Sequence, residues 1–327
     1  MVLVTTCLVV LPAVAEAQIY EAVGTRAQGM GGAFVAVAND ATATWWNPAG
    51  IASGAYLSLL FEQGRLDDPG KAPAFGPATR DTETAFAFAV PSMGLSYYRL
   101  RISEIGTMSP TETVGEDRED QGVDLRALAV SQYGLTVGQS VGQGFALAST
   151  FKLVRAGVSS SRGQPVDGLD QAQDLDVSVA NKSDLDIGAM ISAGSLRVGF
   201  SVKHLFQPEF ETEESSFVME RQARIGVAYL TSGPGSIDGV TVAFDADLTS
   251  TPTAFGDVRH IAAGAEWLGR WVGIRGGLSK NTVGDLETAA SAGASVGLGS
   301  GLHVDGAWTF GDDDSKKGWK LGGRLTF

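Results

Sequence analysis

The sequence predicts an all-β fold: a transmembrane antiparallel β-barrel of about fourteen strands in the outer membrane of a Gram-negative cell. Three observations lead to this prediction. Apolar and polar residues alternate in successive runs across residues 55–327, as expected of strands that show one face to lipid and the other to the lumen. The connections between runs are short and long in turn. No run approaches the about 18 apolar residues of a membrane-spanning helix.

The strands are expected at fourteen runs, and even counts are the rule for bacterial single-chain barrels. The last run has Trp319 and Phe327 on one face and Lys320 and Arg324 on the other. The run 124–140 exceeds the about 9–11 residues that cross a membrane at a tilt, but splitting it would make the count odd, so we expect it whole. The runs are 55–63, 83–90, 94–102, 124–140, 145–157, 184–193, 196–206, 221–231, 239–249, 258–268, 271–281, 288–298, 301–310 and 317–327.

The connections place one end of the barrel in the periplasm. Every second connection is rich in Gly, Pro or Ser, which supply the positive or preset φ that hairpin turns need. The others are mostly longer and more polar, and we place them outside the cell, with both termini in the periplasm. The tight connections are 91–93, 141–144, 194–195, 269–270 and 299–301, with a longer one near 232–237; the outer loops are 64–82, 103–123, 158–183, 207–220, 250–257, 282–287 and 311–316.

Composition narrows the possible partners. The 327 residues include 43 glycines and carry a net charge of −13; so many glycines suit a barrel, where small residues ease strand packing and curvature. Acidic residues crowd two predicted outer loops, at 103–122 and 167–176. We interpret these as solvated loops, with calcium or lipopolysaccharide bridging as the alternative. The sequence has no basic patch, so no nucleic-acid partner is expected.

Residues 1–17 are expected to be a secretory signal peptide. Residues 2–14 are apolar, and Ala15-Glu-Ala17 precedes Gln18 as a cleavage site, although no Lys or Arg precedes the apolar stretch. Cys7 is the only cysteine and would be removed with the signal. The mature chain would then have no thiol, so we predict no disulfide and no sulfur-based metal or redox chemistry. No metal and no cofactor are predicted.

The segment 24–51, before the first expected strand, has an unusual composition. Its Gly-rich start is similar to a phosphate loop, but no strand precedes it and no Gly-Lys-Ser/Thr follows, so a nucleotide site is not expected. Its small residues suit a segment packed tightly in a confined space. Asn47-Pro48 ends regular structure just before the barrel, because Pro48 lacks a backbone donor.

This segment resembles the hatch of the FadL-like long-chain fatty acid transporters, and more closely that of the PorV/PorQ branch of that superfamily. The shared pattern is an Arg, a Gly-rich stretch, an acidic-Ala step and then Asn-Pro-Ala. The matching residues are Arg26, Gly29, Gly32, Asn39, Asp40, Asn47, Pro48 and Ala49. The stretch 259–267 followed by 271–277 also resembles a recurring hairpin of PorV/PorQ and TraF-like members.

After the expected signal peptide (1–17), the resemblance implies an N-terminal plug or hatch (18–54) and a fourteen-stranded barrel (55–327). It implies a channel for hydrophobic or amphiphilic, fatty-acid-like small molecules. Asn47, Pro48 and Ala49 would form the hinge of the hatch, and Arg26 and Asp40 would hold it to the wall. A ligand would lie near the hatch, at residues that fit plug packing equally well: Met30, Phe34, Trp45 and Trp46.

The alternative is a PorV-like accessory of a secretion or surface-attachment system, which binds protein partners through its outer loops. A kinked strand that leaves a gap in the wall beside the hatch would favour transport, and a sealed wall with ordered loops would favour the partner role. Other expected partners are outer-membrane lipid or lipopolysaccharide, and the barrel assembly machinery through Phe327. The chain is shorter than typical fatty acid transporters, which argues against a large outer groove for substrate.

The lumen face is expected to be charged, which argues mildly against a wholly apolar path. Glu266 and Arg275 should lie diagonally across the turn at 269–270, within reach of each other, as a structural ion pair or as part of a polar conduit. The three histidines, 204, 260 and 303, have no spacing that signals a catalytic triad, so an enzyme is not expected. The inward charged residues are predicted to be Lys152, Asp186, Arg197, Lys203, Arg224, Asp245, Asp247, Glu266, Arg275, Lys320 and Arg324.

Overall fold

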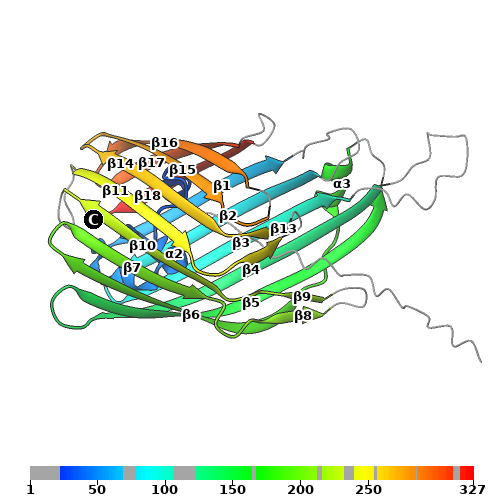
Figure 1. The fold of residues 1–327 in the computed structure, drawn as a ribbon, viewed down its shortest axis with the longest axis horizontal. Coiled ribbons are helices and arrows are strands. Elements are labelled where there is room, and N and C mark those ends of the chain that lie inside the picture. The colour runs from blue at the N-terminus through cyan, green and yellow to red at the C-terminus, as the bar shows by residue number, and fades with distance from the viewer. Residues whose placement is uncertain are drawn as a thin grey trace, which may run out of the picture.

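The chain folds into a closed barrel of fourteen antiparallel strands, seen in the computed structural model (Figure 1). The predicted fold class and strand count are confirmed. The structure describes residues 23–68, 78–106, 123–163, 167–211, 216–231, 239–253, 256–284, 286–311 and 317–327. The expected signal peptide, the start of the hatch at 18–22 and parts of the outer loops lie outside the described residues.

Each predicted run corresponds to one barrel strand, and each strand pairs with the next around a ring that β1 and β18 close. The run 124–140 is a single strand that pairs along its length with its neighbour. The strands are β1 (Ser58–Asp68), β2 (Ala78–Val90), β3 (Met93–Ile105), β4 (Val123–Ser140), β5 (Phe145–Gly163), β6 (Ala180–Ala193), β7 (Leu196–Lys203), β10 (Gln222–Leu230), β11 (Gly239–Asp247), β14 (His260–Leu268), β15 (Val272–Asn281), β16 (Thr288–Gly299), β17 (Leu302–Gly311) and β18 (Lys317–Thr326).

Alternation along the strands separates the two faces of the wall. On β17, Trp308 is 57% exposed and faces out, while its neighbour Ala307 is fully buried and faces the lumen. Trp308 pairs with Trp319 of β18, which also faces out. Because side chains alternate along a strand, the apolar residues form a belt on the outer surface. No helix in the described part of the chain is long and apolar enough to cross a membrane.

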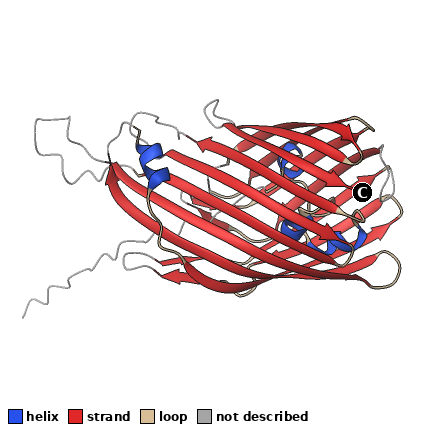
Figure 2. Ribbon diagram, turned by 180° about the vertical axis from the view of Figure 1, so that it is seen from behind, coloured by secondary structure: helices blue, strands red, loops and turns tan. Residues whose placement is uncertain are grey.

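The strands differ greatly in length, so the wall is higher on one side. β4 and β5 have 18 and 19 residues, whereas β7 and β10 have 8 and 9. The long strands extend at the end of the barrel opposite the C-terminus, where α3 (Gly168–Asp174) covers their outer surface (Figure 2). A strand needs only about 9–11 residues to cross a membrane at a tilt, so β4 and β5 continue beyond it.

Three predicted outer loops contain regular structure that the sequence analysis did not predict. The expected loop 158–183 includes the last part of β5, the helix α3 and the start of β6. The expected loop 207–220 contains a short hairpin of β8 (Glu209–Glu211) and β9 (Ser216–Val218). The expected loop 250–257 contains most of another, formed by β12 (Thr251–Thr253) and β13 (Gly256–Val258). Short strands packed on other strands need no long alternating run, so periodicity did not reveal them.

The N-terminal segment lies inside the barrel, where its blue helices are visible behind the strands in Figure 1. We call its described part, residues 23–54, the plug. It contains α1 (Thr25–Gly29), α2 (Ala43–Trp46) and a 3-10 helix, η1 (Pro48–Ser53). α1 lies against β15–β18 and η1 lies against β3–β6, so the plug spans the lumen from one wall to the other.

Candidate functional site: a plug in the barrel lumen

A buried arginine joins the plug to the wall. Arg26 donates two hydrogen bonds to Glu266 of β14, from Nε to Oε1 at 3.0 Å and from Nη2 to Oε2 at 2.6 Å. Its Nη1 donates to Asn39 Oδ1 at 2.9 Å and to Asp40 Oδ2 at 2.5 Å, both within the plug. A bidentate arginine–carboxylate pair fixes orientation as well as position. Arg26 therefore holds two parts of the plug together and binds both to β14.

The charges continue along the wall away from Arg26. Arg275 of β15 lies 3.4 Å from Glu266 and 2.9 Å from Asp305 of β17, and Asp305 lies 3.1 Å from Arg324 of β18. Asp40, Arg26, Glu266, Arg275, Asp305 and Arg324 thus alternate in sign and are all nearly fully buried. We call this set of six residues the charged network. Its members compensate one another, which a buried charge requires.

The geometry of Glu266 and Arg275 differs from the expected diagonal arrangement. The two residues are direct partners in the register of β14 and β15. The turn at Gly269 is tight, with the Gly269 amide donating to the Val272 carbonyl, so equal numbers of residues separate the pair from the turn. The two side chains are consequently closer to each other than a diagonal pair would be, and Glu266 contacts both Arg26 and Arg275.

The neighbouring charges control the ionisation of Asp40 in the plug. Burial disfavours its charged form, but Arg26 and Arg324 outweigh burial, and Thr42 donates hydrogen bonds to it from its amide and its hydroxyl. The pKa of Asp40 is consequently lower than its ordinary value. The carboxylate stays ionised at neutral pH and keeps its ion pair with Arg26.

Two carboxylates of the wall bind backbone amides of the plug. Glu62 of β1 accepts the Thr25 amide at 2.9 Å with either oxygen. Asp245 of β11 accepts the amides of Phe34 and Val35 at 2.7 and 2.8 Å. The Thr25 amide is at the N-terminus of α1 and the other two lie outside helices and strands, so none has a partner within a helix or strand, and leaving them buried without an acceptor would be costly. The sequence pointed to Asp245 as an inward residue but not to its contact with the plug.

Pairs of glycines on adjacent strands make room for the plug backbone. Gly264 of β14 faces Gly277 of β15, and a Cβ on Gly277 would lie 2.1 Å from the carbonyl carbon of Met30. Gly199 of β7 faces Gly226 of β10, and a Cβ on Gly199 would lie 2.5 Å from the Val35 carbonyl oxygen. These glycines therefore allow close backbone approach. Composition predicts only a role in strand packing and curvature for the glycines, and the structure adds contact with the plug backbone.

The other predicted gate residues lie along the same plug–wall interface. Asn47 donates to the carbonyls of Val35 and of Ala189 on β6, at 3.0 and 3.1 Å, and accepts the Ala49 amide as the N-cap of η1. Pro48 occupies the first position of η1, where a missing donor costs nothing. Gly29 and Gly32 lie in the first half of the plug. A Cβ on Gly29 would contact the Arg275 side chain. Gly32 has a φ of 84°, which favours glycine.

The four predicted ligand residues fall into two groups. Met30 and Phe34 are fully buried, and Phe34 packs edge-on against Trp46 with ring centroids 6.1 Å apart. Trp45 and Trp46 line a cavity of about 30 Å³ together with polar residues of β7, β10 and β11. Lys203 Nζ lies 3.3 Å from the centroid of Trp45, a cation–π contact. The cavity has room for a water molecule, so this state holds no larger ligand there.

The lumen on the side of β3–β5 is apolar, which sequence analysis did not predict. Beyond the plug, inward side chains of these strands pack against three side chains on or beside the β8–β9 hairpin. We call this cluster the apolar chamber wall. Its members are Leu100, Ile102, Leu128, Val130, Val154, Ala156 and Val158 from the strands, with Phe210, Phe217 and Met219 from the hairpin, and none is more than 9% exposed.

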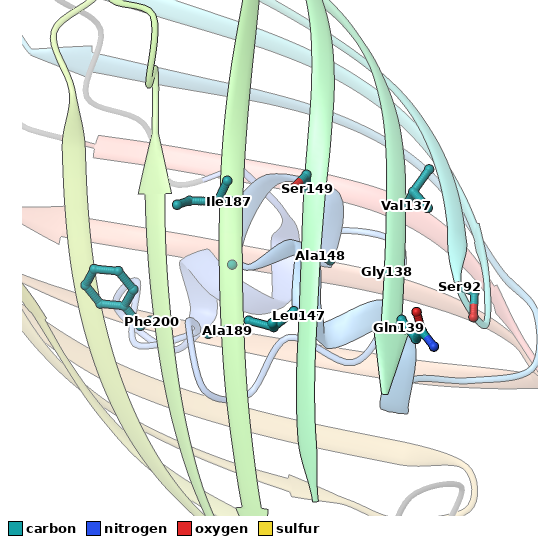
Figure 3. Close-up of a pocket in the computed structure, with 11 residues that line it drawn as sticks. Ser92, Val137, Gly138, Gln139, Leu147, Ala148, Ser149, Ile187, Ala189 and Phe200 are labelled. Carbon is teal, nitrogen blue, oxygen red and sulfur yellow. The ribbon is translucent and has the colours of Figure 1, made fainter. Parts of the chain in front are cut away.

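The wall is closed along β3–β6, where η1 of the plug lies against it. Between β3, β4, β5 and β6 the ladder continues without a register shift, so no kinked strand leaves a gap there. Figure 3 shows the plug ribbon behind these strands, with Val137, Leu147 and Phe200 among the labelled residues that line a pocket. This pocket is a groove of about 730 Å³, and these three residues face outward. The wall is thin there, because a Cβ on Gly188 would lie 2.2 Å from Asn47 Oδ1.

A second buried polar cluster lies where β6 loses its partner β7. The residues of β6 that precede Ile187 do not pair with β7. There the His204 amide, just after β7, donates to the Asp186 side chain. Lys152 lies 2.8 Å from Asp184 and 2.6 Å from Asp186, and His204 Nδ1 lies 2.8 Å from Asp184. Asp184, Asp186 and His204 form a group with the geometry of metal ligands, and Lys152 already supplies a cation to it.

Among the described residues, no histidine forms a catalytic triad. His303 Nδ1 lies 3.0 Å from the Gly301 carbonyl, and the nearby Asp305 binds Arg275, Arg324 and Ser295. His260 donates its amide to Asp247. His204 belongs to the cluster around Lys152.

The comparisons with known proteins agree with this architecture. A family model described as "F plasmid transfer operon, TraF, protein" matches residues 62–247, more than half of the chain. The chain belongs to this TraF family. No curated protein matches the chain.

Several solved structures share the fold of this TraF-family barrel. The CymD monoaromatic hydrocarbon channel is 12% identical, with a TM-score of 0.64 over 93% of this chain and 97% of that chain. The Ralstonia pickettii toluene transporter TbuX is 14% identical, with a TM-score of 0.62 over 96% and 99%. A Pseudomonas aeruginosa FadL homologue is 11% identical, with a TM-score of 0.64 over 93% and 98%. At these identities the likeness establishes the fold alone, that of FadL-type barrels. Among these similar proteins, CymD is described as a channel and TbuX as a transporter.

Proposed function

We propose that this chain is an outer-membrane channel for hydrophobic or amphiphilic small molecules such as fatty acids, closed by its plug. The observation that supports this most is the apolar chamber wall, which forms one continuous buried cluster with apolar residues of the plug such as Trp45. Leu100 and Leu128 are buried inside a barrel whose outer surface already faces lipid, so they offer an apolar environment away from the membrane. Trp45 lies edge-on to Tyr98 of β3, with ring centroids 5.1 Å apart, at the inner end of this region.

The plug would then act as the hatch. Arg26 and Asp40 hold it to the wall, and Asn47, Pro48 and Ala49 form the point at which it bends, next to the thin wall at Gly188. Opening requires the Arg26–Glu266 pair to separate, so we infer that the resting state is closed. The groove outside the thin wall would receive an apolar molecule that leaves through the wall. The closed ladder at β3–β6 means that such an exit needs a change in the wall.

The experiment compares the full chain with a variant that lacks residues 18–50, both reconstituted into vesicles. Entry of a fluorescent long-chain fatty acid is measured with an acceptor inside the vesicles, and vesicles without protein give the background. The deletion variant should admit the probe faster than the full chain. Equal rates for the two proteins would refute the gated-channel proposal.

A second candidate is a PorV-like accessory of a secretion or transfer apparatus. Two observations favour it: the wall is sealed beside the plug, and the family is described by a plasmid transfer operon. Extraction from the native membrane in mild detergent, followed by mass spectrometry, separates the candidates. A stoichiometric apolar molecule without a protein partner supports the channel, and a stable protein partner with an empty barrel supports the accessory role.

A further inference from the structure

The register of β1–β5 places a sharp boundary between apolar and polar side chains on the outer surface. One row across these strands is apolar, and in it the rings of Tyr97 and Tyr133 are tilted by 40° with centroids 5.0 Å apart. The next row of outward residues, towards the outer ends of the strands, is entirely polar. The apolar row is Phe61, Phe86, Tyr97, Tyr133 and Leu153, which is followed by Ser183 on β6, and the polar row is Gln63, Thr84, Arg99, Ser131, Arg155 and Asn181. Tyrosines mark the interface of a membrane barrel, so the polar residues that follow Tyr97 and precede Tyr133 on the same face, Arg99 and Ser131, lie near the level of lipid headgroups.

Two arginines of this row have no ion partner in the described part of the chain. Arg99 and Arg155 are exposed, and Ser131 lies between them in the register. They lie two strand spacings apart, which is about 10 Å. The chain has 37 acidic residues against 24 basic ones, so the absence of a carboxylate from this row differs from the acidic character of the whole protein.

The surroundings of this row add to its positive charge. Arg101, next on the same face of β3, is close enough to Arg99 for the two guanidinium groups to repel each other. Arg101 is already engaged, since its Nη2 donates to the Leu175 carbonyl at 2.5 Å and Asp174 and Asp176 lie nearby. Arg99 and Arg155 are left to bind an external anion. Guanidinium groups bind phosphate with two parallel hydrogen bonds.

We propose that Arg99, Ser131 and Arg155 form a binding site for the phosphate groups of a glycolipid in the outer leaflet. The arginines would bind the phosphates and the Ser131 hydroxyl would donate between them. The tyrosines below would contact the first part of the acyl chains, because their rings lie at the apolar edge of the same surface. This inference rests on the outer-membrane location and orientation proposed above.

The test measures binding of lipid A to the full chain in detergent by native mass spectrometry. The double variant Arg99→Gln/Arg155→Gln is compared with Arg270→Gln, which loses an exposed arginine beside Trp271 at the opposite end of the barrel. The double variant should bind bisphosphorylated lipid A about tenfold or more weakly than wild type, and Arg270→Gln should bind it as wild type does. Dephosphorylated lipid A should bind weakly to all three proteins.

Equal binding by wild type and the double variant would overturn the proposal, as would equal binding of the two forms of lipid A. A further measurement needs no variant: wild-type affinity must fall as salt is raised, and an affinity independent of salt would also refute the site. Orientation is tested separately by labelling Ser161→Cys, at the outer end of β5, on intact cells. Failure of that labelling would count against the proposed orientation and not against phosphate binding, which the detergent assay measures in isolation.

Discussion

Across the lumen from the charged network on β14–β18, the inward faces of β3–β5 carry leucine, isoleucine and valine. The two regions belong to the same barrel and alternate with the same period, yet they differ in what they bind. The charged side binds the plug through buried ion pairs such as Arg26–Glu266. On the apolar side, η1 of the plug also contacts the strands, and farther along them Phe210 and Phe217 of the β8–β9 hairpin cover the inward side chains. In the proposed channel, the ion pairs that retain the plug and the apolar surface that contacts the ligand would lie on opposite walls.

The largest effect is expected on the charged side, from Arg26→Ala. This change leaves Asp40 without its ion pair in the plug and weakens the compensation of Glu266, and breaking one member of a buried pair costs about 3–5 kcal/mol. The plug should become accessible to protease while the barrel remains folded. Proteolysis within residues 23–54, followed by mass spectrometry, measures this.

The matched control for that prediction is Arg65→Ala. Arg65 pairs with Asp67 at 2.7 Å, but both side chains are more than one third exposed, so the pair contributes less than about 1 kcal/mol. If Arg65→Ala increased proteolysis of the plug as much as Arg26→Ala does, the proposal that the charged network holds the plug would be refuted.

A smaller effect is expected from Gly277→Ala, which tests how closely the plug fits its wall. The new methyl group would lie 2.1 Å from the Met30 carbonyl carbon, and such overpacking costs about 1–3 kcal/mol. The neighbouring Gly276→Ala is the control, since its Cβ would come no closer than 3.8 Å to another atom. Thermal unfolding in detergent should be lowered only by Gly277→Ala, and equal shifts would contradict the fit.

The smallest effect is expected on the hairpin side, where acid should loosen the connection that begins at His204. Burial and Lys152 lower the pKa of His204 from 6.5 to about 4. The unfolded state then binds more protons, so this contribution to stability is lost as the pH falls from about 6.5 towards 4. The charged groups facing His204 are Lys152 of β5, Asp184 and Asp186 of β6, and Lys203 of β7.

The plug should respond to acid at lower pH than the hairpin connection. The pKa of Asp40 is lower than its ordinary value of 3.8, so its contribution is present above that pH and is lost only below it. Limited proteolysis between pH 7 and pH 4 should therefore cut near residues 204–221 before it cuts the plug. His204→Asn should abolish this pH dependence, since Asn also tolerates the φ of 55° found there. Simultaneous cleavage of both regions would argue against separate stabilities.

Sequence alone predicted the strands well because alternation is a local property. It placed Lys320 and Arg324 on the lumen face and kept 124–140 as one strand, and the structure has both. The resemblance of the N-terminal segment pointed to Arg26 and Asp40 as residues that hold the plug, and alternation placed Glu266 on the inward face. The structure joins all three by hydrogen bonds through Arg26.

The apolar side of the lumen could not be predicted from the same pattern. Leu128 and Val130 lie in a strand with apolar residues on both faces, because the helix α3 and the hairpin cover the part that rises above the membrane. Alternation assigns apolar residues to lipid, so it misses apolar residues that face inward. The pairing of Gly264 with Gly277 could not be predicted either, because it depends on the register between β14 and β15, which the alternation of residues does not determine.

The most direct test of the central claim is photo-crosslinking of a diazirine-bearing fatty acid to the protein in its membrane, mapped residue by residue. Labelling that excess unlabelled fatty acid removes should fall on inward residues of β4 and β5, such as Val130 and Val154. The adjacent outward residue Leu153 should be labelled only as lipid contacts are, without competition. Competable labelling confined to outward residues, or to the charged network, would contradict the proposal that the apolar side of the lumen is the binding surface.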